Sequence, residues 1–139
     1  MTNDIETKIR ESFARQGMMG TLGARITGIG DGTCAISAPI TPETGQQMGF
    51  AHAGLTFAIG DSAAGYAALT QLADGEEVVT TEMKINLLAP AQGSTLEAEG
   101  RVIRAGRRLL VVAADVFAQD VEKRRHVATL MGSMMPVRP

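Results

Sequence analysis

The sequence is poor in cysteine and tryptophan: Cys34 is its one cysteine, and tryptophan is absent. A single cysteine cannot form a disulfide within the chain. The N-terminal stretch MTNDIETKIRES is polar where a secretory signal would be apolar, so we expect the protein to stay in the reducing cytoplasm. Nothing near Cys34 favours a reactive thiolate, which predicts a small apolar residue of the core.

Basic residues are not in excess, because the formal net charge at pH 7 is -2. A nucleic-acid partner would require a basic face that this composition does not supply. Charged or turn residues interrupt every apolar run before it could cross a membrane, and we expect no membrane contact. The chain also lacks a Cys-x-x-Cys pair and a histidine pair at metal-binding spacing, so we expect no metal and no cofactor.

The length of 139 residues suits one domain, covering residues 1–139. Its first element is predicted to be a helix at about residues 3–16, with Asn3 or Asp4 as its cap and Gly17 as its end. The apolar residues that recur there at helical spacing are Ile5, Ile9 and Phe13. This helix is expected to pack as a flank on something larger.

Strand patterns occupy most of the remaining sequence. Residues 22–29 and 33–40 flank a Gly-Asp-Gly turn, which predicts a hairpin. Residues 41–51 have no apolar period and contain proline and glycine, as expected of a loop. Four more strands, separated by turn signals, are predicted at residues 78–90, 94–106, 107–119 and 124–136.

The segment at about residues 53–72 is apolar all round and has one charged residue, Asp61. A helix that is apolar on every side is expected to be buried on every side. An antiparallel sheet that curls around this central helix is the simplest arrangement that buries both, an α+β fold. Because burying an unpaired charge is costly, Asp61 is expected to have either a structural partner or a chemical role.

The residues around the start of this segment carry a resemblance to a known family. They are Gln46, Gly49, His52, Ala53, Gly54 and Asp61. This run resembles the Asn-x-x-Gly-x-x-His-Gly-Gly signature, with an aspartate nine residues after the histidine, of hotdog-fold acyl-CoA thioesterases of the phenylacetate-degradation (PaaI) type. The stretches KINLLAP and AGRRLLVVAADVF are similar to later strands of that family. The resemblance implies a curved antiparallel sheet around a long central helix, and hydrolysis of an acyl-CoA thioester to free acid and CoA.

Thioester hydrolysis needs a base or nucleophile, and donors for the oxygen that becomes negative. Asp61 is the candidate for the first role, either attacking the carbonyl itself or activating a water. Unpaired N–H groups at the start of the central helix suit the second role. The resemblance assigns the role of donor to this oxygen to the N–H of Ala53, the residue after His52. Gly54 in the same turn is expected to contact the substrate.

Two departures from the signature affect this site. Ala53 stands where the family has glycine, which keeps the N–H but adds a methyl group. Gln46 replaces the asparagine whose side chain assists in the family; its longer amide can make the same hydrogen bonds, and a solvent-facing loop residue is the alternative interpretation. His52 either takes part in the chemistry or fixes the loop by hydrogen bonding.

Further positions complete the predicted site. The resemblance implies a hydroxyl near the start of the following strand that orients the attacking water, which places Thr80 there, or Thr81 if the register slips by one. Both are also ordinary strand residues. Phe50 and Phe57 are candidate walls of an acyl pocket. Basic residues at two predicted turns either meet the phosphates of CoA or are merely solvated; they are Arg101, Arg104, Arg107 and Arg108, and residues 123–125.

Six strands around one helix leave exposed sheet edges, so a second copy of the chain is expected to extend the sheet. The resemblance implies a homodimer or homotetramer with sites between subunits, where Asp61 of one chain faces His52 and Ala53 of another. Two other functions remain open. A hydratase or dehydratase on the same fold would use the same groups for proton transfers, and a non-catalytic acyl-CoA binding module would need the pocket but not Asp61.

Overall fold

The computed structural model describes residues 2–139. In chain order the elements are α1 (Asn3–Arg15), α2 (Gly17–Thr21), β1 (Arg25–Gly30), β2 (Thr33–Pro39), the 3-10 turn η1 (Pro42–Thr44), α3 (Ala53–Leu69), β3 (Glu77–Leu87), β4 (Thr95–Ala105), β5 (Leu110–Gln119) and β6 (Arg124–Val137). Every predicted strand and both predicted helices are present. The central helix α3 begins where expected and ends three residues earlier, at Leu69.

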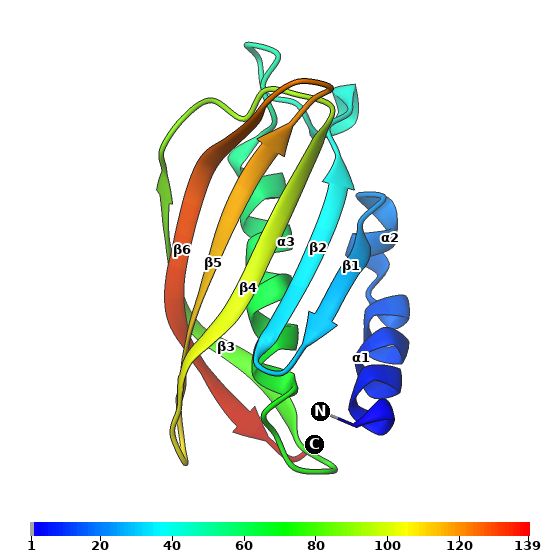
Figure 1. The fold of residues 1–139 in the computed structure, drawn as a ribbon, viewed down its shortest axis with the longest axis vertical. Helices are drawn as coiled ribbons and strands as arrows, with labels where there is room; N and C mark the ends of the chain where they lie inside the picture. Colours follow the sequence, from blue (N-terminus) through cyan, green and yellow to red (C-terminus); the bar gives the residue numbers. More distant parts are fainter. Residues whose placement is uncertain (1) are drawn as a thin grey trace.

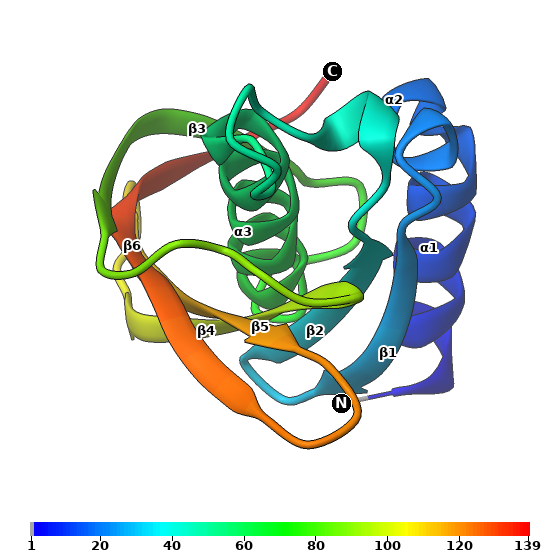
Figure 2. The ribbon, with the colours of Figure 1, turned by 90° about the horizontal axis from the view of Figure 1, so that it is seen from above.

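The strands form one antiparallel sheet in the order β1-β2-β4-β5-β6-β3. This sheet curves around α3, which lies in its hollow (Figures 1 and 2). Within residues 2–139, β1 and β3 are the edges, and each pairs with another strand on one side only. The arrangement is the one that the resemblance predicts, a curved sheet wrapped around a long helix.

Small residues let the sheet approach α3 closely. Ala63 and Ala64 of α3 are completely buried. A Cβ on Gly60 would come within 2.9 Å of the Leu130 side chain on β6, and a Cβ on Gly100 of β4 would overlap the backbone of Ala63. The packing of helix against sheet therefore requires glycine at both places: Gly100 lies against the backbone of α3, and Gly60 lies against a leucine of β6.

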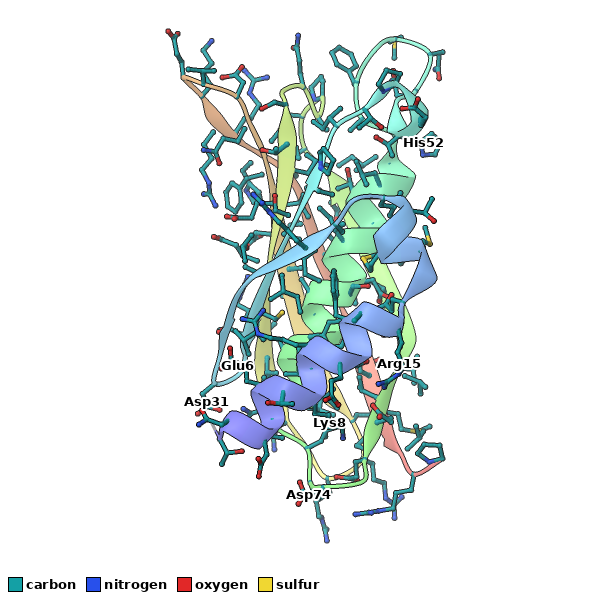
Figure 3. The ribbon with its side chains drawn as sticks, turned by 90° about the vertical axis from the view of Figure 1, so that its right-hand side faces the viewer. Glu6, Lys8, Arg15, Asp31, His52 and Asp74 are labelled. Atoms are coloured by element: carbon teal, nitrogen blue, oxygen red, sulfur yellow. The ribbon has the colours of Figure 1, made fainter. Side chains whose placement is uncertain are left out.

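One face of α3 departs from the prediction of burial on every side. The residues on this face are only half-buried: Phe57, Ala58, Asp61, Ser62 and Gly65. The sheet covers the opposite side of α3, and α1 lies across the side that the sheet leaves open (Figure 3). In a single chain, this face of the apolar helix α3 therefore stays partly exposed to solvent.

The ends of α1 differ from the prediction. Thr2 is the N-cap: its Oγ1 accepts the Ile5 N–H at 3.4 Å, so Asn3 and Asp4 lie inside the first turn. Asp4 there places a negative charge at the positive end of the helix. Gly17 does not return the chain to a loop, because the short helix α2 begins at this residue after the extended Gln16.

Cys34 lies on β2 and is buried, as predicted for a core residue. Burial raises the pKa of its thiol to about 12, so the thiol stays protonated at neutral pH. Among the helices within residues 2–139, none is both long and apolar enough to cross a membrane.

Replacing Gly100 by alanine tests the close approach of β4 to α3. The new methyl group would overlap the Ala63 backbone, which cannot rotate away as a side chain can. We expect the free energy of unfolding to fall by about 1–3 kcal/mol, the usual cost of overpacking a core, in urea denaturation. Gly20→Ala is the control, since a Cβ on Gly20 meets nothing within 4 Å. An equal loss in both variants would contradict the packing argument.

Candidate active site

Asp61 lies on the half-buried face of α3 and has one hydrogen-bond donor among the described residues. Its Oδ1 accepts the hydroxyl proton of Thr80, on the edge strand β3, at 2.8 Å. The neighbouring Thr81 instead hydrogen-bonds to Ser133 of β6, beside a bulge between Thr80 and Glu82. The register of β3 thus brings Thr80, and not Thr81, to the carboxylate.

Burial raises the pKa of the Asp61 carboxyl above its ordinary value, and the hydrogen bond from Thr80 opposes this shift without cancelling it. A carboxylate with a raised pKa holds a proton more strongly than an exposed one, which suits a group that takes a proton from water. The same shift makes the ionised form of Asp61 a cost to the folded state.

A cavity of about 260 Å³, here called the Asp61 cavity, opens beside this carboxylate between α1, α3 and β3. Its other wall residues are Ser12, Gln16, Ser62, Gly65, Tyr66, Leu69, Glu77, Val78, Thr80 and Met134. Ser12 and Gln16 are wall residues that the sequence did not predict. Neither belongs to a motif, and no local pattern reveals that α1 lies across α3.

His52 is the N-cap of α3. Its backbone is extended, with φ -65° and ψ 142°, and its Nδ1 accepts the Gly54 N–H at 2.8 Å. Its own N–H donates to the Thr44 carbonyl, which ties the helix start to the preceding loop. His52 therefore fixes the local structure, one of its two predicted roles. Because Nδ1 is an acceptor here, the neutral ring carries its proton on Nε2.

At the start of α3, the backbone N–H of Ala53 is free to donate a hydrogen bond to a ligand, because no acceptor in residues 2–139 uses it. The Gly54 N–H is taken by the His52 side chain, and those of Leu55 and Thr56 donate to the His52 carbonyl. The Ala53 N–H has no acceptor within residues 2–139. The methyl group of Ala53 causes no backbone strain, since every non-glycine residue described has a negative φ.

Gln46 organises the loop that precedes α3. Its Oε1 accepts the N–H groups of Met48 and Phe50, and its own N–H donates to the Phe50 carbonyl. Gln46, Phe50, His52 and Ala53 all line a second cavity of about 520 Å³, here called the His52 cavity. Phe57 lies on the half-buried face of α3 and lines neither cavity.

The Asp61 cavity and the His52 cavity have no wall residue in common. Ala53 and Asp61 are also separated along α3 by about 12 Å, at about 1.5 Å per residue. A reacting carbonyl must lie roughly 3 Å from both the nucleophile and the oxyanion donors. One chain therefore brings its predicted site residues together in two groups, Asp61 with Thr80 and His52 with Ala53, that cannot act on the same carbonyl.

The arginines predicted to meet CoA lie around the β4–β5 turn, at the opposite end of the sheet from the start of α3 (Figure 1). All four are exposed: Arg101, Arg104, Arg107 and Arg108. Arg101 forms an ion pair with Asp115 at 2.7 Å, and Arg124 of the second basic turn pairs with two glutamates of β4. Both of these arginines are thus neutralised by partners on the sheet.

A family profile and several solved structures match this chain. The profile of the family described as "Thioesterase superfamily" matches residues 48–124, which is more than half of the chain. The chain belongs to the thioesterase superfamily. The matched region of this thioesterase contains His52, Ala53, Asp61 and Thr80, and the family's general chemistry is thioester hydrolysis.

Solved structures extend the match to nearly the whole length of this chain. A thioesterase family protein from Silicibacter pomeroyi is 37% identical, with a TM-score of 0.94, over 97% of this chain and 99% of its own. The PaaI protein of the Escherichia coli phenylacetic acid degradation operon is 20% identical, with a TM-score of 0.86, over 96% and 93%. A Bacillus halodurans protein solved with CoA is 24% identical, with a TM-score of 0.77, over 96% and 89%. These matches confirm the hotdog fold.

Asp61→Asn is expected to stabilise the folded thioesterase at neutral pH. Because burial raises the pKa of Asp61 in the folded state, stability falls as pH rises from the ordinary carboxyl range through the raised pKa, and the ionised group is destabilising above it. Asparagine removes that cost. Urea unfolding should show the variant more stable at neutral pH, with the gain vanishing below the ordinary pKa of aspartate. Asp74→Asn, in an exposed loop, is the control. If the stability gain of Asp61→Asn were the same at every pH, the raised pKa could not be its cause.

Proposed function

We propose that this thioesterase hydrolyses an acyl-CoA thioester to free acid and CoA, with Asp61 of one chain acting opposite the Ala53 N–H of a second copy. The separation of Asp61 from the start of its own helix carries the proposal. The start and the middle of α3 each offer half of a hydrolytic site, and neither half can serve a carbonyl without a partner.

The start of α3 supplies the oxyanion site in this proposal. The thioester oxygen faces the unpaired N–H of Ala53, where the positive end of the helix dipole favours the charge that develops on that oxygen. The Nε2–H of His52 and the side-chain amide of Gln46 are further donors on the same wall. Gly54 offers no free N–H, because His52 Nδ1 already accepts it, and a Cβ on Gly54 would come 3.0 Å from that nitrogen.

Asp61 supplies the attack. In one route its carboxylate attacks the carbonyl carbon, the C–S bond breaks, CoA leaves as a thiolate, and water then cleaves the mixed anhydride. In the other route Asp61 takes a proton from a water that attacks the same carbon. Thr80 holds Oδ1 in both routes, which leaves Oδ2 to face the substrate or the water.

A second copy completes the site by extending the sheet. The outer edge of β3 has no strand partner within residues 2–139, and Thr80 on β3 contacts Asp61 on the half-buried face of α3. Pairing of two β3 strands would satisfy the edge and cover that face at the same time. The resemblance implies a homo-oligomer with sites between subunits, which such a pairing would give. Whether two such dimers form a tetramer stays a prediction.

The CoA part of the substrate is supported by the Bacillus halodurans relative, which was solved with CoA. Arg104, Arg107 and Arg108 are free of ion pairs within residues 2–139, so they remain candidates for its phosphates. Thioesterase superfamily membership favours hydrolysis over hydration of an enoyl group or binding alone. Thiol release from a saturated acyl-CoA tests this directly; hydration of a 2-enoyl-CoA without thiol release would overturn the proposal.

Ala53→Pro should abolish the oxyanion donor while leaving the fold intact. Proline is tolerated at the first position of a helix, and His52 before it already has the extended backbone that proline requires. We expect kcat to fall by about 100- to 1,000-fold, the usual effect of losing one oxyanion donor, measured by thiol release. The melting temperature is the control. A stable variant with normal kcat would exclude the Ala53 N–H from the chemistry.

Mixing two inactive variants tests whether sites lie between subunits. Asp61→Asn is expected to lower kcat by roughly 100-fold or more, as is Ala53→Pro. In a mixed dimer, a site shared between subunits would be intact at one place and doubly altered at the other. Random re-assembly of equal amounts should therefore restore about one quarter of wild-type activity. No recovery after confirmed subunit exchange would place each site within one chain.

A further inference from the structure

The wall of the Asp61 cavity contains a hydrogen-bonded group of three polar side chains, from α1, from the residue that caps the end of α1, and from α3. The Tyr66 hydroxyl of α3 accepts the side-chain N–H of Gln16 at 2.8 Å and lies 3.0 Å from the Ser12 hydroxyl of α1. Tyr66 is held firmly, since it is 6% exposed and its ring meets Phe13 edge-on at 6.1 Å. The mechanism proposed above uses none of these three residues.

This group has one hydroxyl proton more than it can satisfy internally. Gln16 donates to the Tyr66 oxygen, which leaves that oxygen one further acceptor site. Ser12 and Tyr66 together carry two hydroxyl protons, and only one can lie between their oxygens. The second proton has no acceptor among the described residues at hydrogen-bond distance, and both side chains line the cavity.

The cavity also limits the size and charge of its occupant. Its volume of about 260 Å³ is that of eight or nine waters, at about 30 Å³ each, which suits a short acyl group rather than a long fatty chain. Two carboxylates, Asp61 and Glu77, lie in the described wall, and no lysine or arginine does. The nearby Lys8 is engaged by the Glu76 carbonyl. A negatively charged acyl terminus would therefore be repelled.

We propose that the acyl group is short and uncharged, and that an oxygen at the end far from the thioester accepts a hydrogen bond from the Ser12–Tyr66 pair. This inference rests on the proposed function, which places the thioester carbon beside Asp61. Tyr66 follows Asp61 by about 7–8 Å along α3, at about 1.5 Å per residue, which matches a chain of about six carbons. A purely aliphatic end would leave the hydroxyl proton buried without a partner, and sites of this kind discriminate strongly.

Matched CoA thioesters test this specificity. We would compare 5-oxohexanoyl-CoA with 5-methylhexanoyl-CoA and 6-hydroxyhexanoyl-CoA with heptanoyl-CoA, and include adipoyl-CoA for its terminal carboxylate. The wild-type kcat/KM, measured by thiol release, should be at least about tenfold higher for each oxygen-bearing member of a pair. Adipoyl-CoA should be at least about tenfold poorer than 6-hydroxyhexanoyl-CoA.

Tyr66→Phe should remove most of the preference. The ring and its packing on Phe13 remain, so kcat/KM should fall about tenfold for the oxygen-bearing substrates and stay within about twofold for the aliphatic ones. Ser12→Ala, which leaves α1 otherwise unchanged, should reduce the preference in the same direction. Glu11→Gln, on an exposed face of the same helix, is the matched control and should keep it.

The outcomes separate this inference from the proposed function. Thiol release from all five substrates without preference would overturn the inference and leave the proposed function standing. A preference that survives both Tyr66→Phe and Ser12→Ala would also overturn it. Absence of thiol release from every substrate would overturn both.

Discussion

The burial of α3 is the constraint on which the rest of the structure depends. An apolar helix with a single charged residue must be covered, and a six-stranded sheet covers it only if the two backbones can approach closely. Glycine on β4 and alanine on α3 make that approach, with Gly100 against the backbone of Ala63. The curvature of the sheet follows, because the strands must wrap around a cylinder (Figure 2).

The same constraint explains why the candidate site is divided. The helix start has one N–H, that of Ala53, without an acceptor in residues 2–139, while Asp61 lies about two turns further on, on the face that the sheet leaves open. Burial raises the pKa of Asp61, so the fold tolerates a group that costs stability when ionised. Such a cost is typical of residues kept for chemistry.

The N-terminal helix α1 has more than a covering role in this molecule. Ile9 anchors it by complete burial, and Ser12 of α1 and Gln16, which caps the end of α1, reach the Tyr66 hydroxyl. Packing and polar contacts thus fix α1 against α3 at the wall of the Asp61 cavity. A helix that closes a cavity in this way shapes the space available to a bound group, while the proposed catalytic residues Asp61 and Thr80 lie on the central helix and the edge strand.

Local patterns in the sequence determined the elements, the apolar central helix and the unusual position of Asp61, because helix and strand periods depend on near neighbours along the chain. The resemblance pointed to Thr80 or Thr81, and of these two it is Thr80 whose hydroxyl contacts Asp61. Only the tertiary structure decided that α1 brings Ser12 to Tyr66 and that one face of α3 stays open. These features depend on residues far apart in sequence, whose contacts are set by how whole elements pack.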